Sequence, residues 1–164
     1  MSEQSPVTEA PAESMPGRRR LPNFRGADGS VSAKFVDAVS AAIAAHDGEL
    51  LRRMTRRRHE SDVGDLLEAL PEHDRPLFVK LMGAHFDFAA LTEVDDTVRD
   101  EILDELLPEA VAEGVRVLDS DDAVRILEDL PKKEQAEILE ALPAPERIAL
   151  EKSLDYPENS VGRR

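Results

Sequence analysis

Two segments that lie sixty residues apart carry the same pattern of apolar residues and end in the same Leu-Pro pair. The segments are SDVGDLLEALP at 61–71 and SDDAVRILEDLP at 120–131. We expect each to be a helix that begins at its Ser-Asp pair as an N-cap and ends before proline. Apolar residues recur in both at i, i+3, i+4 and i+7, the spacing of one buried helix face: Val63, Leu66, Leu67 and Leu70, and Ala123, Ile126, Leu127 and Leu130.

Other helices of about ten residues are predicted from the same spacing. The first runs from an N-cap at Ser32 to a C-terminal stop at Gly48. Short amphipathic helices that are separated by proline or acidic turns, with no strand pattern between them, stack as a superhelical array. The predicted fold class is therefore all-α, a solenoid-like array of about ten short helices. The remaining predicted helices span 49–58, 72–82, 84–92, 96–106, 108–118, 132–141 and 144–154.

The composition divides the chain into three predicted parts. Residues 1–30 are rich in Pro, Ser, Gly and Glu and lack an apolar period, so we expect a disordered tail. Residues 31–155 hold the helices and form one domain, and residues 156–164 begin a linker. No apolar stretch approaches the roughly 20 residues that cross a bilayer, and no signal peptide is recognisable. We expect the chain as given to be soluble and cytosolic, in agreement with its lack of cysteine.

The charge of the chain is strongly uneven. Residues 59–162 hold nine Lys and Arg against twenty-eight Asp and Glu, a local net charge of −19. Such a surface attracts cations and repels nucleic acid. The basic tract Arg52, Arg53, Arg56, Arg57 and Arg58 has no interleaved aromatic residues for base stacking. We interpret it as a solvated helix face, or as one that pairs with the acidic helices.

No pattern of catalytic residues is present. The sequence lacks a phosphate-binding Gly-rich loop, a G-x-S-x-G motif and an H-E-x-x-H motif, so we predict that the protein is not an enzyme. The acidic residues Asp119, Asp121 and Asp122 do not begin a calcium loop, because such a loop has Gly at its sixth position and Glu at its twelfth. Their simplest interpretation is an N-cap and an acidic first turn, which stabilise a helix.

Three stretches after His59 follow the pattern of a known family: HESDVGDLLEALPEHDRPLFVKLM, then DDTVRDEILDELLPEAVAEGVRVLDSDDAVRILEDLPKKEQAEILEALPAPER, and finally SLDYPENSVGRR. They resemble the intracellular N-terminal domain of MgtE-type magnesium transporters, over roughly residues 35–164. The end of the chain, 156–164, resembles the family's link to paired CBS domains, so we expect a fragment that stops within this link. Flagellar motor-switch middle domains have similar helical repeats. A helical protein-interaction module without metal sensing is therefore the alternative function.

The resemblance implies a cytosolic Mg²⁺-sensing domain that gates a magnesium transporter at the cytoplasmic face of the cell membrane. The implied partners are the CBS domains and the membrane domain of the same transporter, which is a homodimer, and no nucleic acid. The implied cofactor is a weakly bound regulatory Mg²⁺ whose sites are completed by the CBS domains. Its candidate ligands are Asp121 and Asp122, which align with the acidic helix start that faces the CBS domains, with Asp119 and Glu128 as nearby substitutes. Arg125 and Ala89 stand where the family has further acidic residues.

Overall fold

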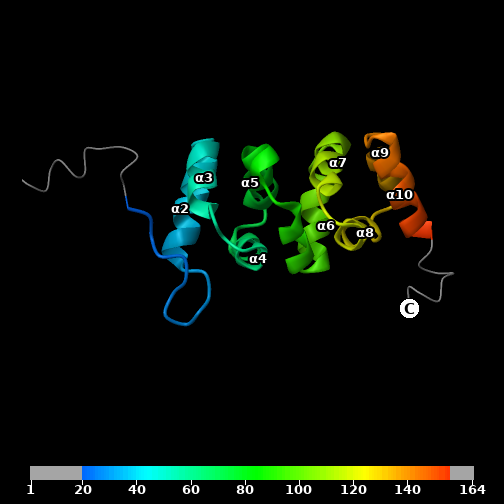
Figure 1. Ribbon diagram of the computed structural model, residues 1–164. Helices are drawn as coiled ribbons and strands as arrows, with labels where there is room; N and C mark the ends of the chain where they lie inside the picture. The colour runs from blue at the N-terminus through cyan, green and yellow to red at the C-terminus, as the bar shows by residue number, and fades with distance from the viewer. Residues whose placement is uncertain (1–19, 156–164) are drawn as a thin grey trace, which may run out of the picture.

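The protein is an elongated array of short helices. The structure, a computed structural model, describes residues 20–155, in which nine α-helices and two 3-10 helices are present and no strand. The all-α prediction is confirmed. The array runs from α2 and α3 at one end to α9 and α10 at the other (Figure 1). The elements are α2 Ala33–Ala44, α3 Gly48–Thr55, α4 Glu60–Ala69, α5 Asp74–Met82, η2 Gly83–His85, η3 Phe88–Glu93, α6 Asp96–Asp104, α7 Pro108–Arg116, α8 Ser120–Leu127, α9 Lys132–Glu140 and α10 Ala144–Asp155.

Polar N-caps begin several of these helices. The Ser32 hydroxyl accepts a hydrogen bond from the Phe35 amide at 3.1 Å, so the predicted cap of the first helix is confirmed. The Asp47 carboxylate does the same for α3 through the amide of Leu50. Each cap satisfies one of the amide donors that the first turn of a helix leaves without an intrahelical acceptor.

The sequence predicted that Gly48 stops the first helix, and this is wrong. Gly48 is the first residue of α3. The helix α2 ends earlier, at Ala44, and the chain turns at His46, which has a positive φ of 56°. A Cβ at position 48 would lie 2.7 Å from the carbonyl oxygen of Leu81 in α5. The glycine therefore allows a close approach of α3 to α5.

The caps of the two repeated helices also differ from the prediction. The imidazole of His59 accepts a hydrogen bond from the Ser61 amide at 3.0 Å, and the Asp119 carboxylate accepts one from the Asp122 amide at 3.0 Å. The Ser-Asp pairs therefore lie inside α4 and near the start of α8, and the residue in front of each helix is the cap.

Residues 84–92 do not form the predicted α-helix but two 3-10 segments, η2 and η3. Phe86 and Phe88 are both buried, and residues two apart in sequence do not share a face of an α-helix. Asp87 between them is extended and caps η3 through the Ala89 amide at 2.9 Å. Burial of both rings thus explains the break.

The sixty-residue repeat extends over four helices. Shifting α2, α3, α4 and α5 by sixty residues places them on α6, α7, α8 and α9. We call residues 33–82 the first copy and residues 96–142 the second copy. The helix α3 packs against α5 in the first copy as α7 packs against α9 in the second. Buried residues match across the copies at the same offset: Phe78, Val79 and Met82 in the first, and Ile138, Leu139 and Leu142 in the second.

A different element follows each copy. The 3-10 helix η3 packs across α4, and α10 packs across α8 at the corresponding place in the repeat. Glycine accommodates η3 twice, because a Cβ at Gly64 would lie 2.8 Å from the Glu93 Cβ, and a Cβ at Gly114 would lie 2.2 Å from the Phe88 ring. The corresponding residues of the other copy are Val124 and Met54, which are buried apolar side chains.

In each copy, a side chain of the next helix donates hydrogen bonds to the carbonyl groups at the C-terminus of α4 or α8, which we call the crossing helix. The Arg75 guanidinium donates to the carbonyl oxygens of Leu67 at 2.8 Å and Glu68 at 3.0 Å. Sixty residues later, the Gln135 amide donates to the carbonyl oxygens of Leu127, Glu128 and Leu130 at 2.9, 3.3 and 3.2 Å. These bonds satisfy carbonyl groups that a helix C-terminus leaves without an intrahelical donor.

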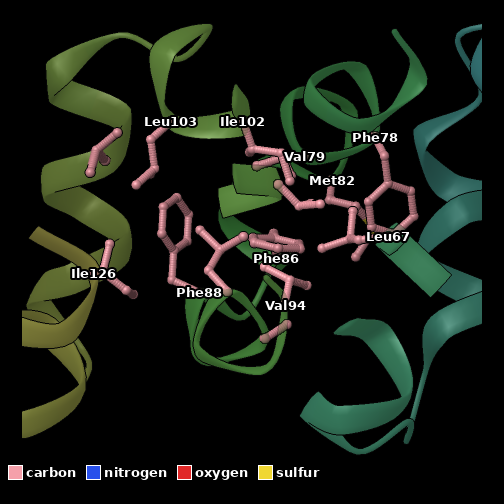
Figure 2. Packing of buried hydrophobic residues seen from close by; sticks show 14 of the residues in the cluster. Leu67, Phe78, Val79, Met82, Phe86, Phe88, Val94, Ile102, Leu103 and Ile126 are labelled. Atoms are coloured by element: carbon pink, nitrogen blue, oxygen red, sulfur yellow. The ribbon is translucent and has the colours of Figure 1, made fainter. Parts of the chain in front are cut away.

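One hydrophobic core runs through both copies and the junction between them (Figure 2). At the junction, Phe86 and Phe88 lie edge to face with ring centroids 5.3 Å apart. Each fully buried Leu or Ile contributes about 1.5–3 kcal/mol, which such short helices need because they are marginal in isolation. The largest fully buried side chains are Phe35, Phe78, Leu51, Met54, Leu66, Leu67, Leu70, Leu91, Ile102, Ile126, Leu127 and Val39.

Residues 20–30, assigned from composition to a disordered tail, pack against the first copy. Phe24 is buried and meets the Phe35 ring edge to face at a centroid distance of 5.0 Å. A short turn follows, in which the Ser30 hydroxyl donates to the Asp28 carboxylate at 2.7 Å and lowers the pKa of that carboxyl. Residues 1–19 of the predicted tail and the predicted link 156–164 lie outside the described residues, so these parts of the division stay predictions.

Candidate functional site

The start of α8 carries three carboxylates, which we call the acidic edge: Asp119, Asp121 and Asp122. Asp119 caps the helix, Asp121 is exposed in the first turn, and Asp122 is half-buried beside it. Carboxylates are favourable here because the N-terminus of a helix carries partial positive charge. The structure thus brings together three of the four predicted metal ligands at one helix end.

Glu128, the fourth predicted ligand, lies at the other end of the same helix. It is the C-cap residue of α8, seven residues after Asp121. Seven residues of α-helix rise about 10 Å along the axis, so Glu128 and the acidic edge cannot ligate one ion. The two departures from the family pattern supply no carboxylate either, because Arg125 is an exposed cation and Ala89 is buried in η3.

The acidic edge is not a complete metal site by itself. Mg²⁺ takes six oxygen ligands at about 2.0–2.1 Å, several of them usually water. Among the side chains of residues 20–154, no group of three or more His, Asp or Glu is arranged to hold a metal ion. One carboxylate oxygen of Asp119 is also engaged with the Asp122 amide. The described residues therefore do not fit a resident Mg²⁺ without ligands from elsewhere.

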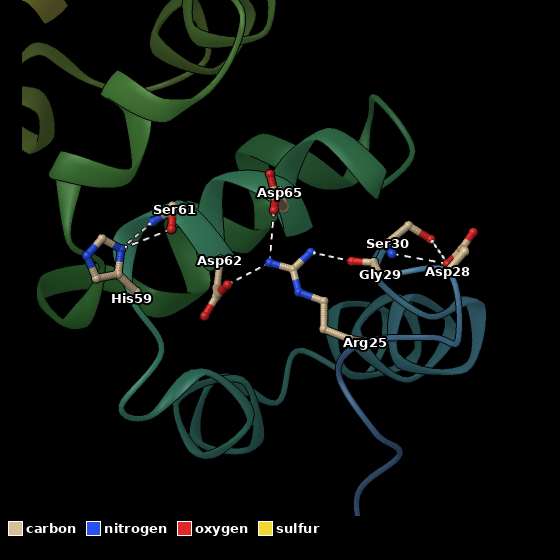
Figure 3. A network of polar contacts seen from close by, with 8 residues as sticks. All are labelled: Arg25, Asp28, Gly29, Ser30, His59, Ser61, Asp62 and Asp65. Atoms are coloured by element: carbon tan, nitrogen blue, oxygen red, sulfur yellow. Dashed lines mark hydrogen bonds and ion pairs between the residues drawn. The ribbon is translucent and has the colours of Figure 1, made fainter.

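The corresponding face of α4 in the first copy carries acidic residues that are neutralised within the chain. The Arg25 guanidinium donates to Asp62 at 2.6 Å and to Asp65 at 2.9 Å (Figure 3). It also donates to the carbonyl oxygen of Gly29 at 3.1 Å, which fixes the arginine from the opposite side. The hydrogen bonds to the two carboxylates raise the pKa of Arg25.

The second copy lacks this neutralisation. Asp122 corresponds to Asp62, and Arg125 corresponds to Asp65, at the sixty-residue offset. Among residues 20–154, whose side chains the structure describes, neither Asp121 nor Asp122 forms an ion pair with Lys, Arg or His. The acidic edge thus keeps its negative charge unpaired among these side chains, whereas Arg25 of the N-terminal segment pairs with the carboxylates of α4.

The basic tract 52–58 helps to hold the same N-terminal segment. The Arg58 guanidinium lies over the Phe24 ring at 4.3 Å and over the Phe35 ring at 5.8 Å from the ring centroids. A guanidinium over an aromatic face is attracted by the ring quadrupole. In the described part of the chain the tract forms no ion pair with the acidic helices, so that half of the prediction is wrong. Arg53, Arg56, Arg57 and Arg58 are exposed, as a solvated face requires.

A buried arginine joins α6 to the turn after α8, and no sequence pattern indicated it. Arg99 is only 3% exposed, and its guanidinium donates to Asp96 at 2.8 Å and to Asp129 at 3.1 Å. The neighbouring Asp100 has one carboxylate oxygen that is buried without a hydrogen-bond partner. Burial raises the pKa of Asp100, against the attraction of Arg99. The only feature of the sequence that could have indicated the burial of Arg99 is its correspondence to Val39 of the first copy, which is fully buried.

Comparison with known proteins gives one decisive match. The model of the MgtE intracellular N domain family matches residues 58–159, more than half of the chain. The chain belongs to this family. A comparison with curated proteins gives no match.

Membership in the MgtE intracellular N domain family fixes the broad class of the protein. The family is one of regulatory domains of transporters and is not an enzyme family. The matched segment begins at Arg58 and includes α4 and the whole second copy. None of the helices in residues 20–155 has both the length and the apolar character that a membrane span requires. The MgtE context makes Mg²⁺ relevant to the protein, although no metal site is formed by the residues that the structure describes.

Proposed function

We propose that this MgtE N domain is a Mg²⁺-sensing regulatory domain, and that its acidic edge faces another domain of the same transporter. The carrying observation is the contrast between the two copies: Arg25 neutralises the acidic face of α4, whereas Asp121 and Asp122 on α8 have no cation partner among the described side chains. Exposed carboxylates facing another anionic surface repel it unless a cation lies between them.

Magnesium suits this role because it keeps several of its waters and uses only one or two protein carboxylates. Asp121 and Asp122 would supply that share from this chain, and the remaining ligands would come from the opposing domain and from water. We assign the opposing surface to CBS domains of the same transporter, in a homodimer at the cytoplasmic face of the membrane. Asp119 is engaged as a cap and Glu128 lies at the far end of α8, so both are secondary candidates.

Calorimetric titration with Mg²⁺ tests this function. The 164-residue chain alone is expected to bind Mg²⁺ only weakly, and a longer chain that includes the CBS domains is expected to bind it clearly more tightly. Asp121→Asn together with Asp122→Asn should abolish the gain. Asp62→Asn with Asp65→Asn is the matched control and should preserve it. Equal binding by the short and long chains, or no Mg²⁺ binding by either, would exclude an interface site.

A further inference from the structure

A groove opens between α5 and α7, where the first copy meets the second. Its volume is about 640 Å³. Val79 and Lys80 of α5 form one wall, α7 forms the other, and Phe86 and Phe88 lie between them. Pockets of about 300–1,000 Å³ are the usual size of binding sites in proteins. None of the residues that line the groove belongs to the acidic edge, so the two are separate surfaces.

The α7 wall presents an apolar stripe made of Leu107, Ala110, Gly114 and Val117. Leu107 is 71% exposed and Val117 is 79% exposed, compared with 54% for Ile148 and 40% for Leu77. Their spacing of three, four and three residues is that of a helix face that packs against another helix. The large side chains Leu107 and Val117 stand exposed at the two ends of this stripe.

The Phe88 ring closes the bottom of this stripe. It occupies the space where a side chain of residue 114 would begin, because a Cβ at Gly114 would lie 2.2 Å from the ring. The first copy has Met54 at the corresponding position, and Met54 is buried. In both copies this position is therefore filled, by the Phe88 ring beside Gly114 in the second and by the Met54 side chain in the first.

The rim of the groove determines the charge of its occupant. Glu105 and Glu113 lie on the side of α7, and Lys80 is on the side of α5. Glu113 is paired with Arg116 at 3.4 Å, but both side chains are exposed and such pairs contribute little. The surrounding residues 59–162 have a net charge of −19. An occupant with basic flanks is therefore favoured on approach and at the rim.

We propose that the groove binds an amphipathic helix of a partner protein, with apolar residues against α7 and Lys or Arg residues toward Glu105 and Glu113. Helices that dock in grooves use apolar anchors at i, i+3, i+4 and i+7, and the stripe of α7, at i, i+3, i+7 and i+10, has the same helical period. Exposed apolar patches rimmed by polar residues mark interaction sites in soluble proteins. This role is independent of Mg²⁺ and goes beyond the proposed sensing function.

The test uses a dye-labelled helical peptide of about 18 residues, five turns long, with Leu at the anchor positions and Lys elsewhere. Its binding to the full 164-residue chain is followed by fluorescence anisotropy. We expect Leu107→Lys and Val117→Lys each to weaken binding by about tenfold or more, because they place a cation at the anchors. Ile148→Lys is the matched control: Ile148 is 54% exposed on α10 and lies outside the groove lining, so this change should leave binding intact.

Two further peptides separate groove binding from general charge attraction. A peptide with Glu in place of Lys should not bind, and a scrambled Lys and Leu peptide should bind at least about tenfold more weakly. Glu113→Gln should weaken binding of the Lys peptide and reduce its salt dependence. Equal binding of the scrambled peptide, or binding unchanged by both groove variants, would overturn the proposal. So would no binding of the Lys peptide.

Sedimentation distinguishes a peptide from a second copy of this chain. The wild-type chain is expected to be monomeric at the concentrations used for anisotropy, as are the two groove variants. A wild-type dimer that Val117→Lys converts to monomer would assign the groove to self-association and overturn the proposal. All four lysine and glutamine variants change exposed side chains, so their melting curves should match that of the wild type.

Discussion

The two copies share one scaffold but use it differently. Both stack four helices in the same order and close the crossing helix with a side chain from the next one, Arg75 in the first copy and Gln135 in the second. They differ where a neighbouring element approaches: Gly64 admits η3 in the first copy, whereas Val124 packs beside α10 in the second. The repeated apolar positions thus determine the scaffold. The element that packs against each copy determines where a glycine replaces a larger apolar residue.

The copies differ more sharply in surface charge. The acidic face of α4 is tied to Arg25 of the N-terminal segment, and the acidic edge of α8 is exposed. Asp62 of α4 therefore pairs with a cation, whereas Asp122 at the same position of α8 has no such partner among the described side chains. This difference in charge pairing is the reason why we place the proposed ligand surface on the second copy.

The largest expected effect is loss of the shared core. Leu127 and its counterpart Leu67 are both fully buried, so Leu127→Asp and Leu67→Asp each place an unpaired charge in that core. The cost exceeds about 4 kcal/mol, a large part of the stability of a typical domain. We expect neither variant to show a cooperative thermal transition by circular dichroism, whereas Val117→Asp, at an exposed site, should melt like the wild type. A partial transition in one variant alone would mean that the copies fold independently.

A smaller effect is expected where η3 meets the second copy. Gly114→Ala gains about 1 kcal/mol of helix propensity, but its Cβ would overlap the Phe88 ring. We expect a net loss of about 1–3 kcal/mol in the free energy of unfolding, measured with urea. Gly26→Ala is the control, because a Cβ there would make only ordinary contacts.

A double-mutant cycle checks the origin of this loss. Phe88→Leu should recover part of the stability that Gly114→Ala removes, because it withdraws the ring that the new methyl group meets. Strictly additive effects of the two changes would refute the close contact.

The helix-closing side chains come next. Gln135 is buried and serves three carbonyl groups, so we expect Gln135→Ala to lower the free energy of unfolding by about 1–3 kcal/mol. Arg75 is half-buried, and water can replace some of its bonds, so Arg75→Ala should cost less, about 1 kcal/mol. Urea denaturation measures both, with Lys133→Ala as an exposed control on α9. A larger loss of stability for Arg75→Ala than for Gln135→Ala would contradict the expectation that Gln135 contributes more.

The smallest effect concerns Asp100, which corresponds to Ser40 of the first copy; both residues are half-buried. Its pKa is raised in the folded state by burial, so the folded state binds the proton more tightly than the unfolded state does. Stability is therefore lost as pH rises from the unfolded pKa of about 3.9 through the higher folded value.

Asp100→Asn removes this charge. We expect a gain of about 1 kcal/mol in the free energy of unfolding at pH 7 and no gain below about pH 3, measured by urea denaturation across pH. Glu137→Gln, at an exposed site within α9, should show neither change. A gain for Asp100→Asn that is independent of pH would contradict the role of the charge.

Much of the fold followed from the sequence because the repeat is local. Spacing of Leu and Ile residues gave the helices, and Ser32 gave the first cap. The errors occurred where tertiary contacts override local preference. Burial of Phe86 and Phe88 breaks the predicted helix 84–92, and packing of Phe24 on Phe35 holds a segment whose composition suggested disorder.

Less of the candidate site could be predicted from the sequence. The acidic edge was predictable as a helix start, because Asp119, Asp121 and Asp122 are neighbours in sequence. The pairing of Arg25 with α4 was not predictable, because it joins residues thirty-seven and forty positions apart. The groove between α5 and α7 likewise depends on how two copies meet, which apolar spacing alone does not determine.

Small-angle X-ray scattering of the complete transporter polypeptide in detergent, with Mg²⁺ varied across the millimolar range, tests the proposed role of the second copy. We expect Mg²⁺ to make the wild type more compact, and the same response when Asp62 and Asp65 are changed to Asn. The response should be lost, or shifted to higher Mg²⁺, when Asp121 and Asp122 are changed to Asn. Two results would contradict the assignment of sensing to the acidic edge of α8. One is an identical response of the two double variants, and the other is a wild type whose compactness does not change with Mg²⁺.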